Sequence, residues 1–273
     1  MRILHVCDGW ERWNGAANIA RMIADEQARD GHAIEFRRWA SLGELRTADQ
    51  VWIHCGWKPC LWWAALVGRH VHWVPEACYD PIRLNYHGWK KRLAGLVERG
   101  CLRRCERLEA CCEAEAGWIR GYLGRKCPEV AVQDIKRFFT FAPIGALDRT
   151  HPLHVLYLGR RHPLKGLEFL EAAVNRVRQD GQAVELKIAS TAFGEEKERV
   201  WAWCDVLCLP TLSDNFGLVV AEALERGKRV ITTDGAPAWK GQCGVIYLEG
   251  YVAAEGERRV AMLKAAIEEV LRI

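Results

Sequence analysis

Short apolar runs along the first half of the chain predict buried strands. The runs occupy residues 2–7, 33–39, 48–55 and 69–75. Between the first two runs, four apolar residues recur at helical spacing and predict an amphipathic helix over 16–29: Ala16, Ile19, Ala20 and Ile23. Strands that alternate with helices in this way are typical of an α/β domain with a parallel sheet.

The second half of the chain repeats the alternation. Apolar runs at 154–158, 183–189, 206–210 and 229–233 predict strands, and helical periodicity follows the first of them as far as Arg178 and returns over 257–273. Another helix is expected to begin near Phe216 and to end near Gly227. A stretch of mixed polarity at 140–151 separates the two halves. We therefore predict an N-terminal domain over 1–145 and a C-terminal domain over 146–273.

Residues 89–110 form a basic amphipathic segment. Apolar side chains near helical spacing are Leu93, Leu96, Val97, Cys101 and Leu108, and much of the remainder is Lys90, Lys91, Arg92, Arg99, Arg103, Arg104 and Arg107. One interpretation is a solvated helix face on a packed domain. The other is peripheral docking on an anionic membrane, where each basic residue near the surface contributes about 1 kcal/mol.

Composition limits the classes of protein that remain. The 273 residues suffice for two domains, and 50% hydrophobic with 27% charged residues is a soluble globular balance. The net charge of +4 is compatible with a phosphorylated ligand or an anionic membrane surface, and it is far from that of a dedicated nucleic-acid binder. We therefore expect no nucleic-acid partner.

The twelve cysteines are scattered, and none forms a C-x-x-C pair. The N-terminus lacks the apolar core of a signal peptide, and no run approaches the roughly 18 apolar residues that span a bilayer. This pattern predicts a cytoplasmic protein with reduced thiols. A metal cluster of His87, Cys101, Cys105 and Cys111-Cys112 is an alternative, but the spacing suits no known site, so we expect buried thiols and no metal.

Two loops of the C-terminal half carry chemistry suited to phosphate. Residues 159–166 follow a predicted strand and contain Arg160 and Lys165. Ser213, Asp214 and Asn215 precede the helix expected near Phe216, where free backbone N–H groups and the helix dipole favour an anion, and Gly217 permits close approach. Because carboxyl ends of parallel strands share one sheet edge, both loops are expected along the edge where ligands of such sheets bind.

The N-terminal half has a weaker phosphate signal. Loop 8–15 joins the first strand to the first helix, and Gly15 closes it, so this loop suits phosphate binding. Its glycines do not form G-x-G-x-x-G, which argues against a nicotinamide oxidoreductase, an interpretation that shares the α/β class.

The stretch 209–239, LPTLSDNFGLVVAEALERGKRVITTDGAPAW, resembles a signature of retaining GT-B-fold glycosyltransferases of family 4. Asp214, Phe216, Gly217 and Glu222 match its E-x7-E pattern, with Asp in place of the first Glu. The octet GRRHPLKG at 159–166 is similar to the family's G-R-x-x-P-x-K-G loop. Further similarity covers 13–36 and ADQVWIHC at 48–55, which includes His54, whereas Glu76 stands where relatives often have arginine.

The resemblance implies two Rossmann-type parallel-sheet domains that face each other across a cleft, a GT-B-like architecture. It implies that Arg160 and Lys165 bind the donor diphosphate with Gly15 and the backbone of Phe216, Gly217 and Leu218. It further implies that Asp214 binds the transferred sugar and Glu222 the ribose, and it makes Asp214, Glu222 and His54 the catalytic candidates. The nucleotide-diphosphate sugar is then the donor substrate, and no cofactor or metal is expected.

The function implied is a metal-independent retaining hexosyltransferase that acts on a cell-surface glycan or lipid-linked acceptor, as in polysaccharide or lipopolysaccharide biosynthesis. It would be cytoplasmic or peripheral on the inner face of the cytoplasmic membrane. The chain lacks a strand and helix of about 20–30 residues that relatives carry before residue 206. A catalytically inactive nucleotide-sugar-binding partner subunit is therefore the main alternative, and a basic membrane-docking scaffold built on 89–110 is another.

Overall fold

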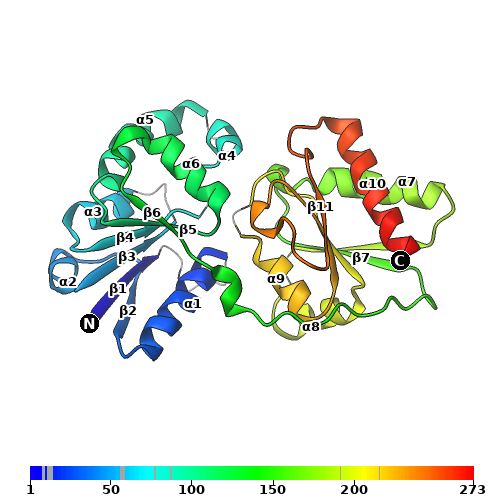
Figure 1. Cartoon of the computed structure of the whole chain (residues 1–273), viewed down its shortest axis with the longest axis horizontal. Coiled ribbons are helices and arrows are strands. Elements are labelled where there is room, and N and C mark those ends of the chain that lie inside the picture. The colour runs from blue at the N-terminus through cyan, green and yellow to red at the C-terminus, as the bar shows by residue number, and fades with distance from the viewer. Residues whose placement is uncertain are drawn as a thin grey trace. The chain divides into compact units, whose positions relative to one another are not determined.

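The computed structural model describes residues 1–7, 10, 15–55, 59–76, 78–86, 88–190, 192–214 and 216–273, without the side chains of 59, 60, 88 and 90–92. The chain forms two compact units, Met1–Phe138 and Phe139–Ile273 (Figure 1). The division comes before the predicted domain boundary at 145/146, because the intervening segment is bonded to the second unit. The Ala142 N–H donates to the Leu224 carbonyl at 3.0 Å, and the Gly145 N–H donates to the Gly227 carbonyl at 3.0 Å.

The N-terminal unit is a parallel sheet with the strand order β2-β1-β3-β4-β5-β6. The strands are β1 (Arg2–Cys7), β2 (Ala33–Arg37), β3 (Gln50–His54), β4 (Val71–Val74), β5 (Arg107–Ala110) and β6 (Glu129–Val132). The helices are α1 (Gly15–Arg29), α2 (Leu42–Thr47), α3 (Pro59–Val67), α4 (Pro81–Tyr86), α5 (Gly88–Leu102) and α6 (Glu113–Leu123), with short 3-10 turns η1 (Gly124–Lys126) and η2 (Ile135–Phe138).

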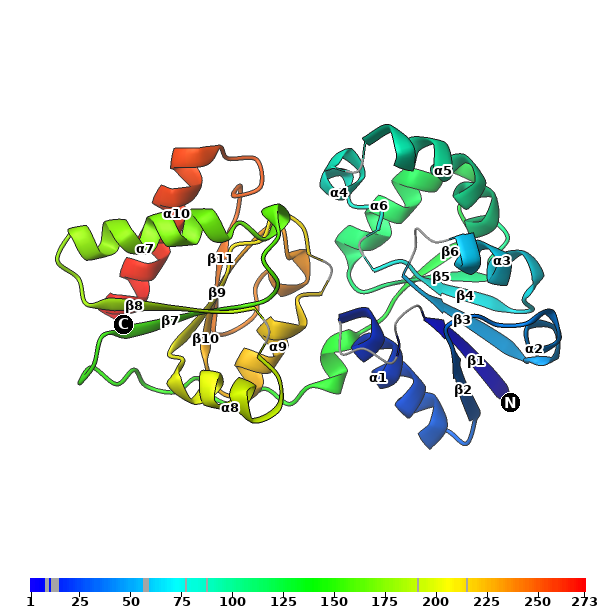
Figure 2. The same cartoon turned by 180° about the vertical axis from the view of Figure 1, so that it is seen from behind.

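The C-terminal unit is a second parallel sheet with the order β11-β10-β9-β7-β8 (Figure 2). Its strands are β7 (Leu153–Leu158), β8 (Val184–Ala189), β9 (Val206–Leu209), β10 (Arg229–Thr233) and β11 (Val245–Leu248). Its helices are α7 (Leu167–Gln179), α8 (Gly194–Trp203), α9 (Leu218–Glu225) and α10 (Gly256–Arg272), with 3-10 turns η3 (Pro163–Lys165) and η4 (Pro237–Trp239).

Both sheets follow one topology when their strands are counted from the start of each unit. The first five strands of the N-terminal sheet and all strands of the C-terminal sheet have the order 2-1-3-4-5. In such doubly wound sheets the ligand crevice lies at the carboxyl ends of the strands where the winding direction reverses. The switch points are therefore β1/β3 in the N-terminal unit and β7/β9 in the C-terminal unit.

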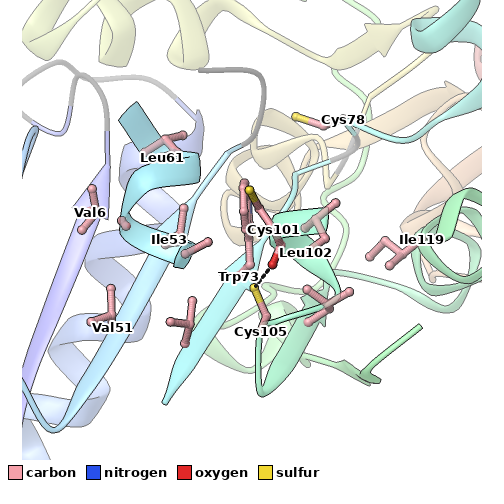
Figure 3. Close-up of a cluster of buried hydrophobic side chains, with 14 of the residues drawn as sticks. Val6, Val51, Ile53, Leu61, Trp73, Cys78, Cys101, Leu102, Cys105 and Ile119 are labelled. Carbon is pink, nitrogen blue, oxygen red and sulfur yellow. Dashed lines mark hydrogen bonds between the residues drawn. The ribbon is translucent and has the colours of Figure 1, made fainter. Parts of the chain in front are cut away.

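The core of the N-terminal unit explains several of the cysteines. Cys78, Cys101 and Cys105 are buried among Trp73, Leu102 and other apolar side chains, and the Cys105 thiol donates to the Cys101 carbonyl at a sulfur–oxygen distance of 3.6 Å (Figure 3). Burial raises the pKa of the Cys105 thiol to about 12. These thiols are thus packing groups, and His87 of the alternative metal cluster lies outside the described residues.

The basic segment 89–110 is not one continuous helix, because α5 ends at Leu102 and β5 begins at Arg107. Its apolar residues also do not share one face. Cys101 and Leu108 are buried, whereas four others on α5 are largely exposed: Trp89 (67%), Leu93 (60%), Leu96 (69%) and Val97 (55%). Their spacing of four, three and one residues places them on one exposed helix face. Within the described residues, no helix has the length and apolarity needed to cross a bilayer.

Candidate functional site

The loop after β7 is held close to the sheet. The Tyr157 hydroxyl donates to the Arg160 carbonyl at 2.9 Å, and the His162 side chain accepts from the Leu164 N–H at 3.1 Å, which caps η3. Gly166 follows η3 with φ = +63°, a left-handed conformation that favours glycine. A Cβ atom at this position would overlap the Pro210 carbonyl oxygen. Close approach to the chain after β9 therefore requires glycine here.

Hydrogen bonds join the loops that follow β7 and β9. The Leu164 carbonyl accepts from the Leu212 N–H at 2.8 Å and from the Thr211 hydroxyl at 3.1 Å. Farther along, the Asp214 N–H donates to the Gly235 carbonyl at 2.7 Å, which adds the loop after β10. Strands β7 and β9 define the switch point and run parallel. The loops that follow them therefore meet at one sheet edge, as the sequence predicted.

Lys165 and Asp214 form an ion pair between these two loops. Their side chains are 14% and 19% exposed, so the pair is partly withdrawn from water while one side remains accessible. Arg160, the other expected cation, is exposed on the same loop as Lys165. The loop after β7 thus brings Arg160 and Lys165 to the same sheet edge as the Asp214 carboxylate of the loop after β9.

The three residues at the start of α9 serve different purposes. The Phe216 side chain is buried against Phe139 and Trp239, and its carbonyl accepts from the Trp239 indole N–H, so it anchors the turn. Gly217 takes φ = +68° immediately before the helix, and Leu218 is the first helical residue. Because the first N–H groups of a helix have no intrahelical acceptor, the backbone of Phe216–Leu218 offers donors to an anion.

Glu222 lies on α9 and is paired with Lys197 of α8. The Lys197 ammonium nitrogen lies 2.8 Å from Glu222 Oε1 and 2.7 Å from Oε2. Sequence reasoning missed Lys197, because a lysine in an otherwise polar helical stretch has no distinguishing spacing. The contact between Lys197 and Glu222 depends on how α8 and α9 pack, and no local sequence pattern predicts it.

In the N-terminal unit, His54 ends β3 at that unit's switch point and is completely buried. His54 Nε2 lies 2.9 Å from His5 Nδ1, and His5 Nε2 lies 2.8 Å from Gln27 Oε1. Burial lowers the pKa of His54 well below its ordinary value and that of His5 to about 4, so both rings are neutral at pH 7. Gly15, exposed at the start of α1, is described, but 8, 9 and 11–14 of its loop are not.

The neutral rings give this chain of hydrogen bonds a direction. With Gln27 Oε1 as the acceptor, His5 Nε2 carries the proton, His5 Nδ1 accepts from His54 Nε2–H, and His54 Nδ1 is left as an acceptor. That nitrogen lies 3.9 Å from Glu76 Oε1. Burial raises the pKa of the Glu76 carboxyl well above its ordinary value, so a protonated Glu76 complements the His54 acceptor.

The folding stability of the Glu76→Gln variant is expected to increase relative to that of the wild type as pH rises. Since the folded pKa of Glu76 is raised, the unfolded chain loses this proton first, and folding stability falls as pH increases above the ordinary value of 4.5. Glutamine removes that loss, which amounts to about 1.4 kcal/mol per pH unit. Urea unfolding at pH 5, 6 and 7 measures the difference, with Glu129→Gln, an exposed carboxylate of β6, as the control for charge. An unchanging difference between Glu76→Gln and wild type would contradict the buried, protonated state.

Comparison with known proteins gives a likeness of fold. Neither a protein-family model nor a curated protein matches the sequence. Sucrose-phosphate synthase from Thermosynechococcus elongatus is similar in structure, with a TM-score of 0.69 and 14% identity over 100% of this chain and 90% of that one. A trehalose-6-phosphate structure from E. coli bound with UDP-2-fluoro glucose has a TM-score of 0.68 and 11% identity, covering 99% and 91%. Anabaena HepE in complex with UDP-glucose has a TM-score of 0.64 and 14% identity, covering 99% and 91%.

These structures confirm the GT-B-like fold class expected from the sequence, with two α/β units built on parallel sheets. At 10–14% identity the likeness concerns fold alone, since one fold hosts many activities.

Proposed function

We propose that this chain is a glycosyltransferase that takes a hexose from a nucleotide-diphosphate sugar. The observation that carries the proposal is the Lys165–Asp214 pair beside the start of α9, at the β7/β9 switch point. The acidic motif at 214–222 and the likeness of fold to structures that hold UDP-glucose or UDP-2-fluoro glucose support it. The same motif supports a place among the retaining family 4 enzymes.

Arg160 and Lys165 bind the donor diphosphate in this proposal. As the bond to the sugar breaks, negative charge grows on the departing phosphate, and fixed cations stabilise that charge. The backbone N–H groups of Phe216, Gly217 and Leu218 add donors at the positive end of α9. These groups thereby stabilise the charge on the leaving group without a metal ion.

The two acids bind hydroxyl groups. Asp214, held by Lys165 and by its own N–H bond to Gly235, accepts from hydroxyls of the transferred sugar. Glu222 accepts from the ribose hydroxyls, and its two oxygens have lone pairs enough for both ribose and Lys197. The Asp214 side chain is shorter than that of the glutamate it replaces in the motif. The ion pair with Lys165 fixes the position of the Asp214 carboxylate oxygens.

The N-terminal unit holds the acceptor. His54 is completely buried, so in this proposal it positions the carboxyl end of β3 through its contacts with His5 and Glu76. Gly15 lets a phosphate or sugar approach the start of α1. Retention at the anomeric carbon follows if the departing phosphate oxygen itself takes the acceptor's proton. Such a reaction depends on positioning and charge stabilisation, and it needs no protein nucleophile.

The acceptor is proposed to be a glycan or lipid-linked sugar at the cytoplasmic face of a membrane. The names of two similar structures contain sugar phosphates, which makes a soluble sugar phosphate the competing acceptor class. The exposed apolar face of α5 favours the lipid-linked class, because four large side chains there face solvent in a helix that also carries Lys90, Lys91 and Arg92. Aromatic and leucine side chains beside basic residues are typical of helices that lie in the membrane interface.

Leu93→Ser with Leu96→Ser is expected to weaken sedimentation with phosphatidylglycerol vesicles by roughly 100-fold, because each buried leucine contributes at least about 1.5 kcal/mol. Leu42→Ser, an exposed leucine of α2, is the matched control and leaves sedimentation unchanged. Equal vesicle binding by wild type and the double variant would contradict membrane binding through the apolar face of α5.

The activity itself is tested with a panel of nucleotide sugars and both acceptor classes. We expect calorimetric binding of at least one nucleotide sugar, slow hydrolysis without acceptor, and faster turnover with a lipid-linked acceptor than with a hexose phosphate. Binding with no turnover on any acceptor would instead support the inactive partner subunit. The absence of binding to the whole panel would contradict the proposed function.

A further inference from the structure

A cluster of two histidines and an aspartate lies at the amino edge of the C-terminal sheet. His154 is the second residue of β7, His151 lies three residues earlier, and Asp205 immediately precedes β9. Because β7 and β9 are paired in parallel, with Val155 beside Val206, their first residues lie together. This edge is opposite the one that carries Lys165 and Asp214, so the cluster is separate from the proposed donor site.

The surroundings hold the cluster in place. The His154 N–H donates to Asp205 Oδ2 at 2.9 Å, and the Asp205 N–H donates to the His154 carbonyl at 3.0 Å. The His154 ring is stacked with His151 and with Trp203, each at a centroid distance of 4.2 Å. The Lys187 ammonium group lies over the Trp203 ring at 4.1 Å. Both the carboxylate and the His154 imidazole therefore have fixed orientations before any ligand binds.

Two distances within the cluster are close to those of groups around a shared centre. Asp205 Oδ2 lies 3.7 Å from His151 Nδ1 and 3.8 Å from His154 Nδ1, and one ligand atom from each of the three residues lies within 4.8 Å of the others. In a tetrahedral site with bonds of about 2.0–2.1 Å, neighbouring ligand atoms are about 3.3–3.4 Å apart. The two Asp205 contacts need adjustments of a few tenths of an ångström to reach that spacing. The His151 ring, which is stacked parallel to the His154 ring, has to turn out of the stack so that both ring nitrogens point at one ion.

Two other histidine–carboxylate pairs of this chain give the distances of direct hydrogen bonds for comparison. His70 Nδ1 lies 2.6 Å from Glu106 and His72 Nδ1 lies 3.0 Å from Glu109, both within hydrogen-bonding range. The cluster differs, because its ring nitrogens stay 3.7–3.9 Å from all the surrounding carboxylates, which include Asp148 beside His151 and Glu185 beside His154. Three carboxylates around two imidazoles make the site attractive to a cation while leaving room for one.

We propose that His151, His154 and Asp205 bind a Zn²⁺ ion, with a water molecule as the fourth ligand. Two imidazoles and one carboxylate are a ligand set that suits zinc. Ligation through His151 Nδ1 replaces its present bond to the Pro152 carbonyl at 2.8 Å, and the proton on that nitrogen passes to solvent. Because the ion ties the start of β7 to the start of β9, it stabilises the C-terminal unit.

Titration of the metal-free full chain with Zn²⁺ tests the proposal. Calorimetry is expected to show one equivalent bound, and the same equivalent is expected to raise the thermal unfolding temperature. His151→Ala and Asp205→Asn should each weaken binding by more than the 10–100-fold that loss of an outer-shell partner costs. His151→Ala removes a partly exposed ring, and its unfolding temperature without metal shows whether the fold survives.

Two controls separate this site from other zinc ligands. His70→Ala removes an exposed histidine of the N-terminal unit, and Cys243→Ser removes an exposed thiol; both should bind as wild type does. Co²⁺ spectra should lack thiolate charge-transfer bands. No binding, binding that survives both ligand substitutions, or binding lost with Cys243→Ser would each overturn the proposal.

Discussion

Arg160→Ala combined with Lys165→Ala is expected to weaken nucleotide-sugar binding by about 10²–10⁴-fold. Each lost charge-assisted hydrogen bond costs about 1.5–3 kcal/mol, and 1.4 kcal/mol is a factor of ten in affinity. Lys165→Ala alone should cost more than Arg160→Ala alone, because it also removes the ammonium group that pairs with the Asp214 carboxylate near the diphosphate. Calorimetry on the single and double variants measures both effects.

The matched control is Lys240→Ala with Arg272→Ala, which removes the same charge from exposed positions of the same unit. This control should bind as wild type does at a given ionic strength. If the control weakens binding as much as the Arg160/Lys165 double variant, net charge would explain the effect. If the double variant keeps full affinity, the assignment of both residues to the diphosphate is wrong.

Gly166→Ala is expected to lower the free energy of unfolding by about 2–5 kcal/mol. About 1–2 kcal/mol comes from a left-handed conformation at φ = +63°, and about 1–3 kcal/mol comes from the overlap of the new Cβ with the Pro210 carbonyl. The substitution also pushes apart the loops that carry Lys165 and Asp214, so it should weaken nucleotide-sugar binding as well.

Gly181→Ala separates these two causes. Gly181 has φ = +82°, but no heavy atom lies within 4 Å of a Cβ built there, so only the conformational cost of about 1–2 kcal/mol applies. Urea unfolding of the two variants measures the difference between them. Equal losses would show that Gly166 is needed for its conformation alone and that the two loops tolerate separation.

Much of the α/β framework could be predicted because strands of a covered parallel sheet are continuous apolar runs. Strands β1 and β10, for example, coincide with the runs at 2–7 and 229–233. Other elements gave weaker signals. Strand β11 is only partly buried along its length, and helix α3 is apolar on all sides, so neither shows the periodicity that identifies an element.

The sequence also placed the loops of Arg160, Lys165 and Asp214 at one sheet edge, because strand direction alone decides which loops share an edge. The pairing of Lys165 with Asp214 and of Lys197 with Glu222 needed the packed structure, since each contact joins elements distant in the chain. Helix α5 shows the same limit. Spacing put Leu93, Leu96 and Val97 near one face, but only the structure shows that this face is uncovered.

The most direct test is diffraction from crystals soaked in UDP-glucose, the ligand present in the HepE structure. We expect the diphosphate within hydrogen-bonding distance of Arg160, Lys165 and the first N–H groups of α9, with the ribose at Glu222 and the sugar at Asp214. Clear density for the nucleotide sugar away from the β7/β9 edge would contradict it.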